Sequence, residues 1–153
     1  EVNESLLTGM LAVGYEIPTK TVRVSSGAAR TKVDLLGGGR MLHEKGFQIN
    51  ATAGTRKFLV ENGIDNAIEV SWPDEHRDNN VMDMIARHDF DLIINVPKNY
   101  TKHEMTNGYK IRRAAVDHNI PLITNARLAG AFIEAFCTIG KEDIPIKSWK
   151  EYK

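Results

Sequence analysis

Short apolar segments alternate with helical segments along most of this chain, and the alternation restricts the fold to the α/β class. The most informative segment is "FDLIINVP" at residues 90–97, which is a nearly unbroken apolar run. Such a run is typical of a central strand in a parallel sheet, because helices cover both faces of that strand. The chain is therefore expected to build a parallel sheet around this segment.

The remaining segments extend the same pattern. Four further strands are predicted at residues 21–26, 47–52, 67–72 and 120–125. Helices are predicted at residues 31–44, 55–62, 80–88, 109–119 and 126–137. This βαβ series predicts a three-layer α/β/α sandwich with a five-stranded parallel sheet. Three successive glycines at 37–39 lie inside a predicted helix, where glycine is unfavourable, and indicate either close packing against a neighbour or a helix break.

The two ends of the chain lie outside this series. "NESLLTGMLAVG" predicts a short helix before the first strand, and "IKSWKEYK" is a polar tail. We expect a connecting helix and linker at 1–20, the main domain at 21–140 and a tail at 141–153. The chain begins at Glu1 rather than Met, which suggests a fragment or a processed product.

Composition excludes several classes of protein. The 153 residues include 20 basic and 20 acidic side chains, and this balance argues against a nucleic-acid-binding protein. No apolar run approaches the roughly 20 residues that cross a membrane, so no membrane partner is expected. Cys137 is the single cysteine, which excludes an internal disulfide and fits a reducing compartment. Its apolar neighbours indicate an inert packing role.

Polar residues follow the predicted strands, at the edge where parallel sheets bind their ligands. They are Ser25 and Ser26, Thr52 to Thr55, Trp72, Asn95 with Lys98, and Asn125. The stretch "INATAGT" also opens a predicted helix, whose N terminus attracts anions. This set suits a small anionic ligand that forms hydrogen bonds, and the alternative is that these residues merely cap helices and turn the chain.

Groups suited to catalysis are sparse. The segment "PDEHRDNN" at 73–80 has the composition of a solvated loop, although it contains three carboxylates and a histidine. His103 and Glu104 could transfer protons, whereas no pair of histidines has the spacing of metal ligands. We therefore expect neither catalytic residues nor a metal site.

Three longer stretches resemble a known family. "GFQINATAGTRKFLVENGI", "FDLIINVPKN" and "GYKIRRAAVDHNIPLITN" resemble the methylglyoxal synthase-like (MGS-like) domain, in particular the C-terminal allosteric domain of carbamoyl phosphate synthase large subunits. The resemblance covers about residues 21–137. Stand-alone synthases of this family are lyases with a catalytic aspartate in a glycine-rich third loop and another aspartate after the fourth strand. Here "SWPDEHRDNN" and "NVPKN" lack that pattern, so the resemblance implies binding without a reaction.

The resemblance also implies which residues bind the effector. The matching positions are Lys32, Thr52, Thr55, Trp72, Asn95, Lys98 and Asn107. Lys32 is reached through a variable loop of the family, and Trp72 could instead be a packing residue at the edge of the pocket. The effector candidates are UMP, IMP, UTP, phosphoribosyl pyrophosphate and N-acetyl-L-glutamate, and the sequence does not choose among them.

For the parent enzyme, the resemblance implies synthesis of carbamoyl phosphate from ATP, bicarbonate and glutamine or ammonia, for pyrimidine and arginine biosynthesis. ATP and Mg²⁺ or Mn²⁺ would serve the parent, with no cofactor in this segment. The expected partners are the remaining synthetase domains, with a glutaminase subunit as a further candidate, in a cytoplasmic oligomer. The alternatives are a stand-alone lyase of the methylglyoxal synthase type and a ligand-free structural or oligomerisation domain.

Overall fold

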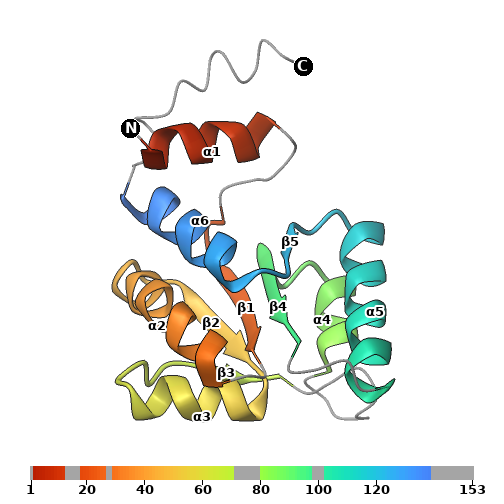
Figure 1. The fold of residues 1–153 in the computed structure, drawn as a ribbon. Helices are drawn as coiled ribbons and strands as arrows, with labels where there is room; N and C mark the ends of the chain where they lie inside the picture. Colours follow the sequence, from red (N-terminus) through yellow and green to blue (C-terminus); the bar gives the residue numbers. More distant parts are fainter. Residues whose placement is uncertain (1, 13–17, 27–28, 71–79, 98–101, 139–153) are drawn as a thin grey trace.

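The structure of the protein is a computed structural model that describes residues 2–12, 18–26, 29–70, 80–97 and 102–138. A parallel sheet of five strands in the order β3-β2-β1-β4-β5 forms its centre (Figure 1). The strands are β1 (Thr21–Ser26), β2 (Gln48–Ala51), β3 (Ile68–Glu69), β4 (Leu92–Val96) and β5 (Leu122–Ile123). The predicted α/β sandwich with a five-stranded parallel sheet is thereby confirmed.

Helices cover both faces of the sheet. They are α1 (Val2–Ala12), α2 (Ala29–Glu44), α3 (Ala53–Glu61), α4 (Val81–Ala86), α5 (Lys102–Asp117) and α6 (Ala126–Thr138). Figure 1 shows α4 and α5 on one side of the sheet and α2 with α6 on the other, while α1 packs against α6. None of the described helices is both long and apolar enough to cross a membrane.

Successive side chains along a strand point to opposite faces of the sheet, so the apolar core consists of two clusters, one on each face. Val22 and Val24 of β1 belong to the larger apolar cluster, with residues of α1, α2, α3 and α6. Ile93 of β4 belongs to the second cluster, with residues of α4 and α5. Arg23 is the register partner of Ile93, so it starts from the face that α4 and α5 cover. A charged residue thus occupies a position that the strand pattern reserves for the core.

The strand order also locates a crevice. The chain proceeds outward from β1 to β2 and β3, then crosses back so that β4 pairs with the other side of β1. Connecting helices therefore diverge to opposite faces at the β1–β4 boundary. In open α/β sheets, ligands bind at such a reversal, beyond the carboxyl ends of the strands. Ser25 of β1 and Asn95 of β4 are register partners at that boundary.

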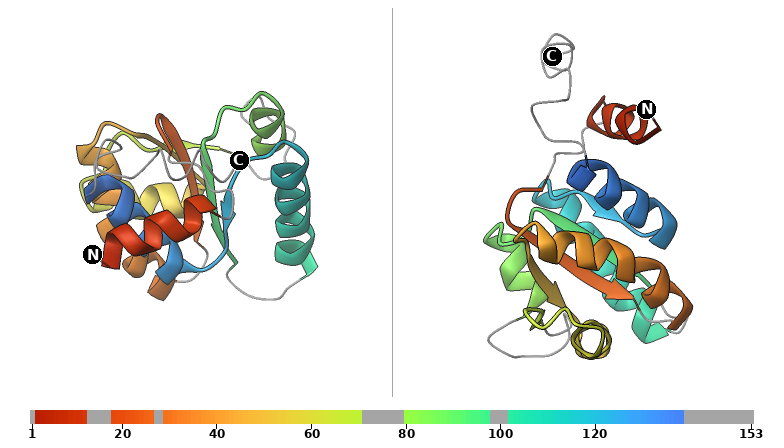
Figure 2. Two further views of the ribbon diagram at one scale, coloured as in Figure 1. Left: turned by 90° about the horizontal axis from the view of Figure 1, so that it is seen from above. Right: turned by 90° about the vertical axis from the view of Figure 1, so that its left-hand side faces the viewer.

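The three glycines lie within an unbroken α2, so a helix break is wrong, and close packing explains Gly38 and Gly39 but not Gly37. A Cβ on Gly38 would lie 3.0 Å from Ile133 Cδ1 of α6, and one on Gly39 would lie 3.1 Å from Ile64 Cδ1. Gly38 and Gly39 therefore allow α2 to approach its neighbours closely, and the right-hand view of Figure 2 shows α2 beside α6.

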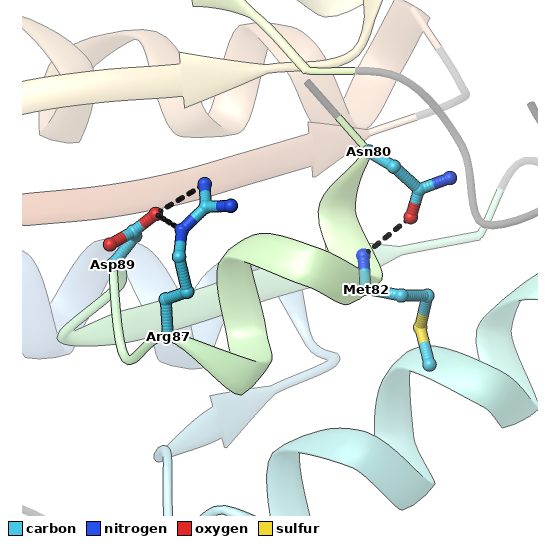
Figure 3. Close-up of polar contacts among 4 residues, drawn as sticks. All are labelled: Asn80, Met82, Arg87 and Asp89. Carbon is cyan, nitrogen blue, oxygen red and sulfur yellow. Dashed lines mark hydrogen bonds and ion pairs between the residues drawn. The ribbon is translucent and has the colours of Figure 1, made fainter. Parts of the chain in front are cut away.

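The helix α4 begins at a well-formed cap. The Asn80 side chain accepts a hydrogen bond from the backbone N–H of Met82 at 2.7 Å, as N-cap residues do (Figure 3). At the other end, the Arg87 guanidinium contacts the Asp89 carboxylate at 2.9 Å across an exposed turn. Asn80 is therefore a buried helix cap rather than part of a solvated loop. Residues 73–79 lie outside the described chain.

The largest difference from the predicted elements concerns α5. We predicted a helix at 109–119 after a polar loop, whereas α5 begins at Lys102 and includes Asn107. The polar residues of "KHEMTN" sustain a helix because most of them are acceptable on a solvated helix face. Gly108 does not end the helix either. A Cβ there would lie 3.9 Å from Asn95 Nδ2, so this part of α5 adjoins the carboxyl end of β4.

Candidate functional site

Three short polar side chains form a row across the carboxyl end of the sheet. Ser25 and Asn95 are register partners on β1 and β4, and Thr52 directly follows β2. Ser25 Oγ lies 3.4 Å from Thr52 Oγ1, within hydrogen-bonding distance. All three residues are buried, with at most 8% of their surface exposed. The sheet therefore ends in a compact polar floor at the crevice between β1 and β4.

The N terminus of α3 lies beside this floor. Thr52 is its N-cap residue, with extended backbone angles, but its side chain makes no capping hydrogen bond. The first amides of an α-helix have no partner within the helix, so they carry a partial positive charge that attracts anions. The missing side-chain cap leaves this terminus suited to an external acceptor.

Lys32 of α2 lies next to the same helix terminus. A Cβ placed on Gly54, in the first turn of α3, would be 3.5 Å from Lys32 Nζ. Gly54 therefore leaves room for the ammonium group of Lys32, a residue that is partly exposed. The structure thus places Lys32 at the predicted site, although α2 belongs to a different βα unit from Thr52. Coulombic attraction from Lys32 adds to that of the helix terminus for any anion bound there.

Thr55 binds the protein's own backbone. Its Oγ1 accepts a hydrogen bond from Ser26 N–H at 3.1 Å and donates one to the Ser26 carbonyl at 3.2 Å. Thr52 Oγ1 donates to Thr55 Oγ1 at 3.3 Å, so Ser25 must be the donor in its contact with Thr52. The hydroxyl protons of Thr52 and Thr55 are both used within the protein. Their predicted contact with an effector stays a prediction.

Arg23 lies beneath the polar floor and was not among the predicted site residues. Its side chain is fully buried, and burial lowers the pKa of its guanidinium to about 10, which leaves the group charged at neutral pH. Its Nη1 lies 3.5 Å from Asn95 Oδ1. The signal was present in the sequence, because "TVRVSS" contains one charged residue in a strand that is otherwise suited to burial.

The other predicted residues fall into two groups. Asn107 is buried within α5, beside the Gly108 that adjoins Asn95. The structure therefore brings together Lys32, Thr52, Thr55, Asn95 and Asn107 around one end of the sheet. Trp72 and Lys98 lie outside the described residues, so their predicted roles remain expectations.

Most of the titratable groups that sequence analysis considered for chemistry, those of residues 73–79 among them, lie outside the part of the chain that the structure describes. The side chains of His103 and Glu104 lie outside the description, and the described residues contain no group of three His, Cys, Asp or Glu able to hold a metal ion. Cys137 lies in the α6 core, where burial raises the pKa of its thiol to about 11. It is therefore protonated and inert at neutral pH.

Comparisons with known proteins agree on one family. The MGS-like domain matches residues 34–124. The chain is 33% identical over 95% of its length to the multifunctional protein CAD of Squalus acanthias, of which it covers 7%. It is 40% identical over 86% of its length to the C-terminal section of the carbamoyl phosphate synthase large chain of Aquifex aeolicus, covering 24% of that protein. The large chain of Archaeoglobus fulgidus is 39% identical over 93% of this chain, which covers 13% of it.

A solved structure supports the fold. Methylglyoxal synthase from Elizabethkingia anophelis superposes with a TM-score of 0.52 at 22% identity, over 74% of this chain and 76% of that one. At this level of identity, the likeness extends to the arrangement of strands and helices and not to the chemistry of the site.

Proposed function

Because the chain belongs to the MGS-like domain family, we propose that it is the allosteric, effector-binding domain of a carbamoyl phosphate synthase large chain, or of a multifunctional protein that contains one. The chain spans between 7% and 24% of the three relatives described above. In this proposal, ATP, the Mg²⁺ or Mn²⁺ ions and the synthesis of carbamoyl phosphate belong to synthetase domains outside this chain. Those domains, with a glutaminase subunit where nitrogen comes from glutamine, are its partners in a cytoplasmic oligomer.

The observation that carries the proposal is the convergence of donors at the carboxyl end of the sheet. The α3 N terminus lacks a side-chain cap, Lys32 lies beside it, and Ser25, Thr52 and Asn95 form the floor. The helix dipole, the Lys32 ammonium and the side-chain amide of Asn95 favour a negatively charged ligand, whereas the hydroxyl protons of Thr52 and Thr55 are used within the protein. The described floor contains no carboxylate that could act as the acid or base of a lyase. Binding without turnover is the function that these groups support best.

Regulation requires that the effector bind two states of the parent enzyme unequally, with a coupling free energy of typically about 1–3 kcal/mol. The site joins elements that could transmit such a preference. Thr55 ties α3 to β1, Gly108 brings α5 against Asn95, and α1 packs on α6. We propose that an effector draws α3 and α5 toward the floor, and so changes how the domain packs on the synthetase body.

A thermal-shift panel tests binding directly. The chain would be heated with UMP, IMP, UTP, phosphoribosyl pyrophosphate or N-acetyl-L-glutamate in turn. A ligand at 100 times its Kd stabilises the native state by about 2.7 kcal/mol. In a domain of this size, each kcal/mol raises Tm by about 2–4 °C, so a true effector gives a clear shift. If none of the five shifts Tm, the structural or oligomerisation domain replaces this proposal.

Regulation and turnover need separate assays. In the full-length parent enzyme, the compound that shifts Tm should also change the rate of carbamoyl phosphate synthesis. The purified chain should release no methylglyoxal from dihydroxyacetone phosphate. Production of methylglyoxal would favour the lyase and contradict the proposal of a purely regulatory domain.

A further inference from the structure

Arg23 reaches from the core toward the candidate site. Its register partner on β4 is Ile93, yet its Nη1 contacts the side chain of Asn95, which lies two residues further along β4. The guanidinium therefore points along the sheet toward the carboxyl ends of the strands. There it lies beneath the row of Ser25, Thr52 and Asn95, on the same face of the sheet.

The guanidinium is poorly satisfied where it lies. Both its Nε and its Nη2 are buried without a hydrogen-bond partner, and the contact of Nη1 with Asn95 is long at 3.5 Å. Asn50 is the register partner of Arg23 on β2, but its Oδ1 also lacks a partner. Burial of an unpaired charge is unfavourable, and protein interiors normally avoid it.

None of the buried side chains in the described part of the chain neutralises this charge. The buried polar residues that the structure describes are serines, threonines, asparagines and Arg23 itself, without a carboxylate among them. The uncapped N terminus of α3 and Lys32 both add positive potential at the same end of the sheet. The Arg23 guanidinium, the α3 N terminus and the Lys32 ammonium therefore repel one another in the protein without ligand. One bound anion would offset the repulsion among all three.

We propose that Arg23 is an anion-binding residue whose guanidinium holds an oxyanion of the effector from beneath the floor, opposite the N terminus of α3. This inference rests on the proposed function and adds a residue and a ligand chemistry to it. The planar guanidinium can present Nε and Nη2 as a pair of parallel donors, which match two oxygens of a phosphate or a carboxylate. The contact with Asn95 uses Nη1 and leaves that pair unoccupied.

The test compares Arg23→Met with Arg87→Met. Met resembles the Arg stem in length and removes the charge, and Arg87 is an exposed arginine away from the floor, paired with Asp89. Each variant would be titrated with inorganic phosphate, UMP and N-acetyl-L-glutamate, with Tm measured in the absence of ligand as well. Phosphate and UMP test a phosphoryl group, and N-acetyl-L-glutamate tests a carboxylate.

We expect Arg23→Met to weaken binding of one ligand class by at least about tenfold, since hydrogen bonds to a charged partner are lost. Its Tm without ligand should equal or exceed that of the wild type, because an unpaired charge is removed. Arg87→Met should bind like the wild type. Unchanged affinity in Arg23→Met overturns this inference and leaves the proposed function intact. If wild type and Arg87→Met bind no anion, the proposed function fails and the inference fails with it.

A measurement on the unsubstituted protein covers the case in which Arg23→Met does not fold. With ¹⁵N-arginine labelling, the Arg23 Nε–H resonance can be assigned by its absence from Arg23→Lys. Addition of the binding anion should shift this resonance and slow its exchange with water, because the proton enters a hydrogen bond. An unchanged Nε–H signal at saturating anion would overturn the inference without any measurement of a variant's affinity, since Arg23→Lys serves only to assign the resonance.

Discussion

The Thr55 hydroxyl joins the first turn of α3 to Ser26, the last residue of β1, because it accepts from the Ser26 N–H at 3.1 Å and donates to the Ser26 carbonyl at 3.2 Å. Thr55 is almost fully buried. The family resemblance implies that this residue contacts the effector. Its hydrogen bonds also give Thr55 a structural role, because they hold the N terminus of α3 against the edge of the sheet where the candidate site lies.

Replacement of Thr55 by Val should therefore destabilise the protein. Valine has nearly the same shape but leaves the N–H and C=O of Ser26 buried without this partner, at a cost of about 1–3 kcal/mol. Chemical denaturation would measure the loss, with Thr55→Ser as the matched control that retains the hydroxyl. Equal stability of Thr55→Val and the wild type would show that this link contributes nothing to the fold.

Lys32 offers a cleaner test of the site than Thr55, because it is partly exposed and makes no hydrogen bond with the part of the chain that the structure describes. Lys32→Gln should leave the denaturation midpoint unchanged. It should weaken an anionic effector by about tenfold, the loss typical of a hydrogen bond to a charged group. The natural control is Lys57→Gln, which removes the same charge from the exposed side of α3. An identical response of the two variants would argue against a position for the anion beside Gly54.

The sequence was a good guide to elements whose pattern is local. The first strand was predicted at its observed bounds, and the apolar run at 90–97 contains β4, because burial on both faces leaves a clear apolar signature. The bounds of the edge strands were predicted less accurately. β3 and β5 are much shorter than the predicted segments, since each pairs with one neighbour and needs few apolar residues.

Features that depend on neighbours distant in sequence were harder to predict. The local sequence does not show that Gly38 packs against Ile133. Nor does it show that Lys32, in the first βα unit, lies next to Gly54 in the second. Arg23 was missed for a different reason. Most of the predicted site residues lie at or just after the ends of the predicted strands, whereas an arginine inside a strand can still reach that edge because its side chain is long.

The glycines of α2 predict opposite outcomes for one substitution at adjacent positions. Gly37 is exposed and a Cβ there meets no atom within 4 Å, so Gly37→Ala should stabilise the protein by up to about 1 kcal/mol through helix propensity. Gly38→Ala gains the same propensity but forces a Cβ to within 3.0 Å of Ile133 Cδ1, so it should be the less stable variant.

A double-mutant cycle tests whether the Cβ of Gly38→Ala and the Ile133 side chain compete for the same space. Ile133→Val removes the Cδ1 atom that a Cβ on Gly38 would approach. Combined with Gly38→Ala, it should cost less than the sum of the two single substitutions, as expected for residues that compete for one space. Thermal denaturation of the four proteins measures the interaction. Strict additivity would mean that α2 and α6 move apart enough to accommodate the extra carbon.

The last prediction concerns pH and Cys137, which is buried in α6. Burial raises the pKa of its thiol from an ordinary 9.0 to about 11, with a small opposing effect from Lys45. The unfolded chain releases this proton near pH 9, whereas the folded protein retains it until about pH 11. Between these values the unfolded state binds fewer protons, so stability falls as pH rises, by an amount on the order of 2–3 kcal/mol.

Comparison with Cys137→Ala isolates this contribution, because lysines and tyrosines also titrate in the same range. We expect the free energy of unfolding of the wild type to decline more steeply between pH 9 and 11 than that of the variant. At pH 8, a thiol reagent should modify the native protein slowly and the urea-unfolded protein rapidly, since the protonated buried thiol is a poor nucleophile. Parallel pH curves for the two proteins, or rapid modification of the native thiol, would contradict the buried position of Cys137 in the α6 core.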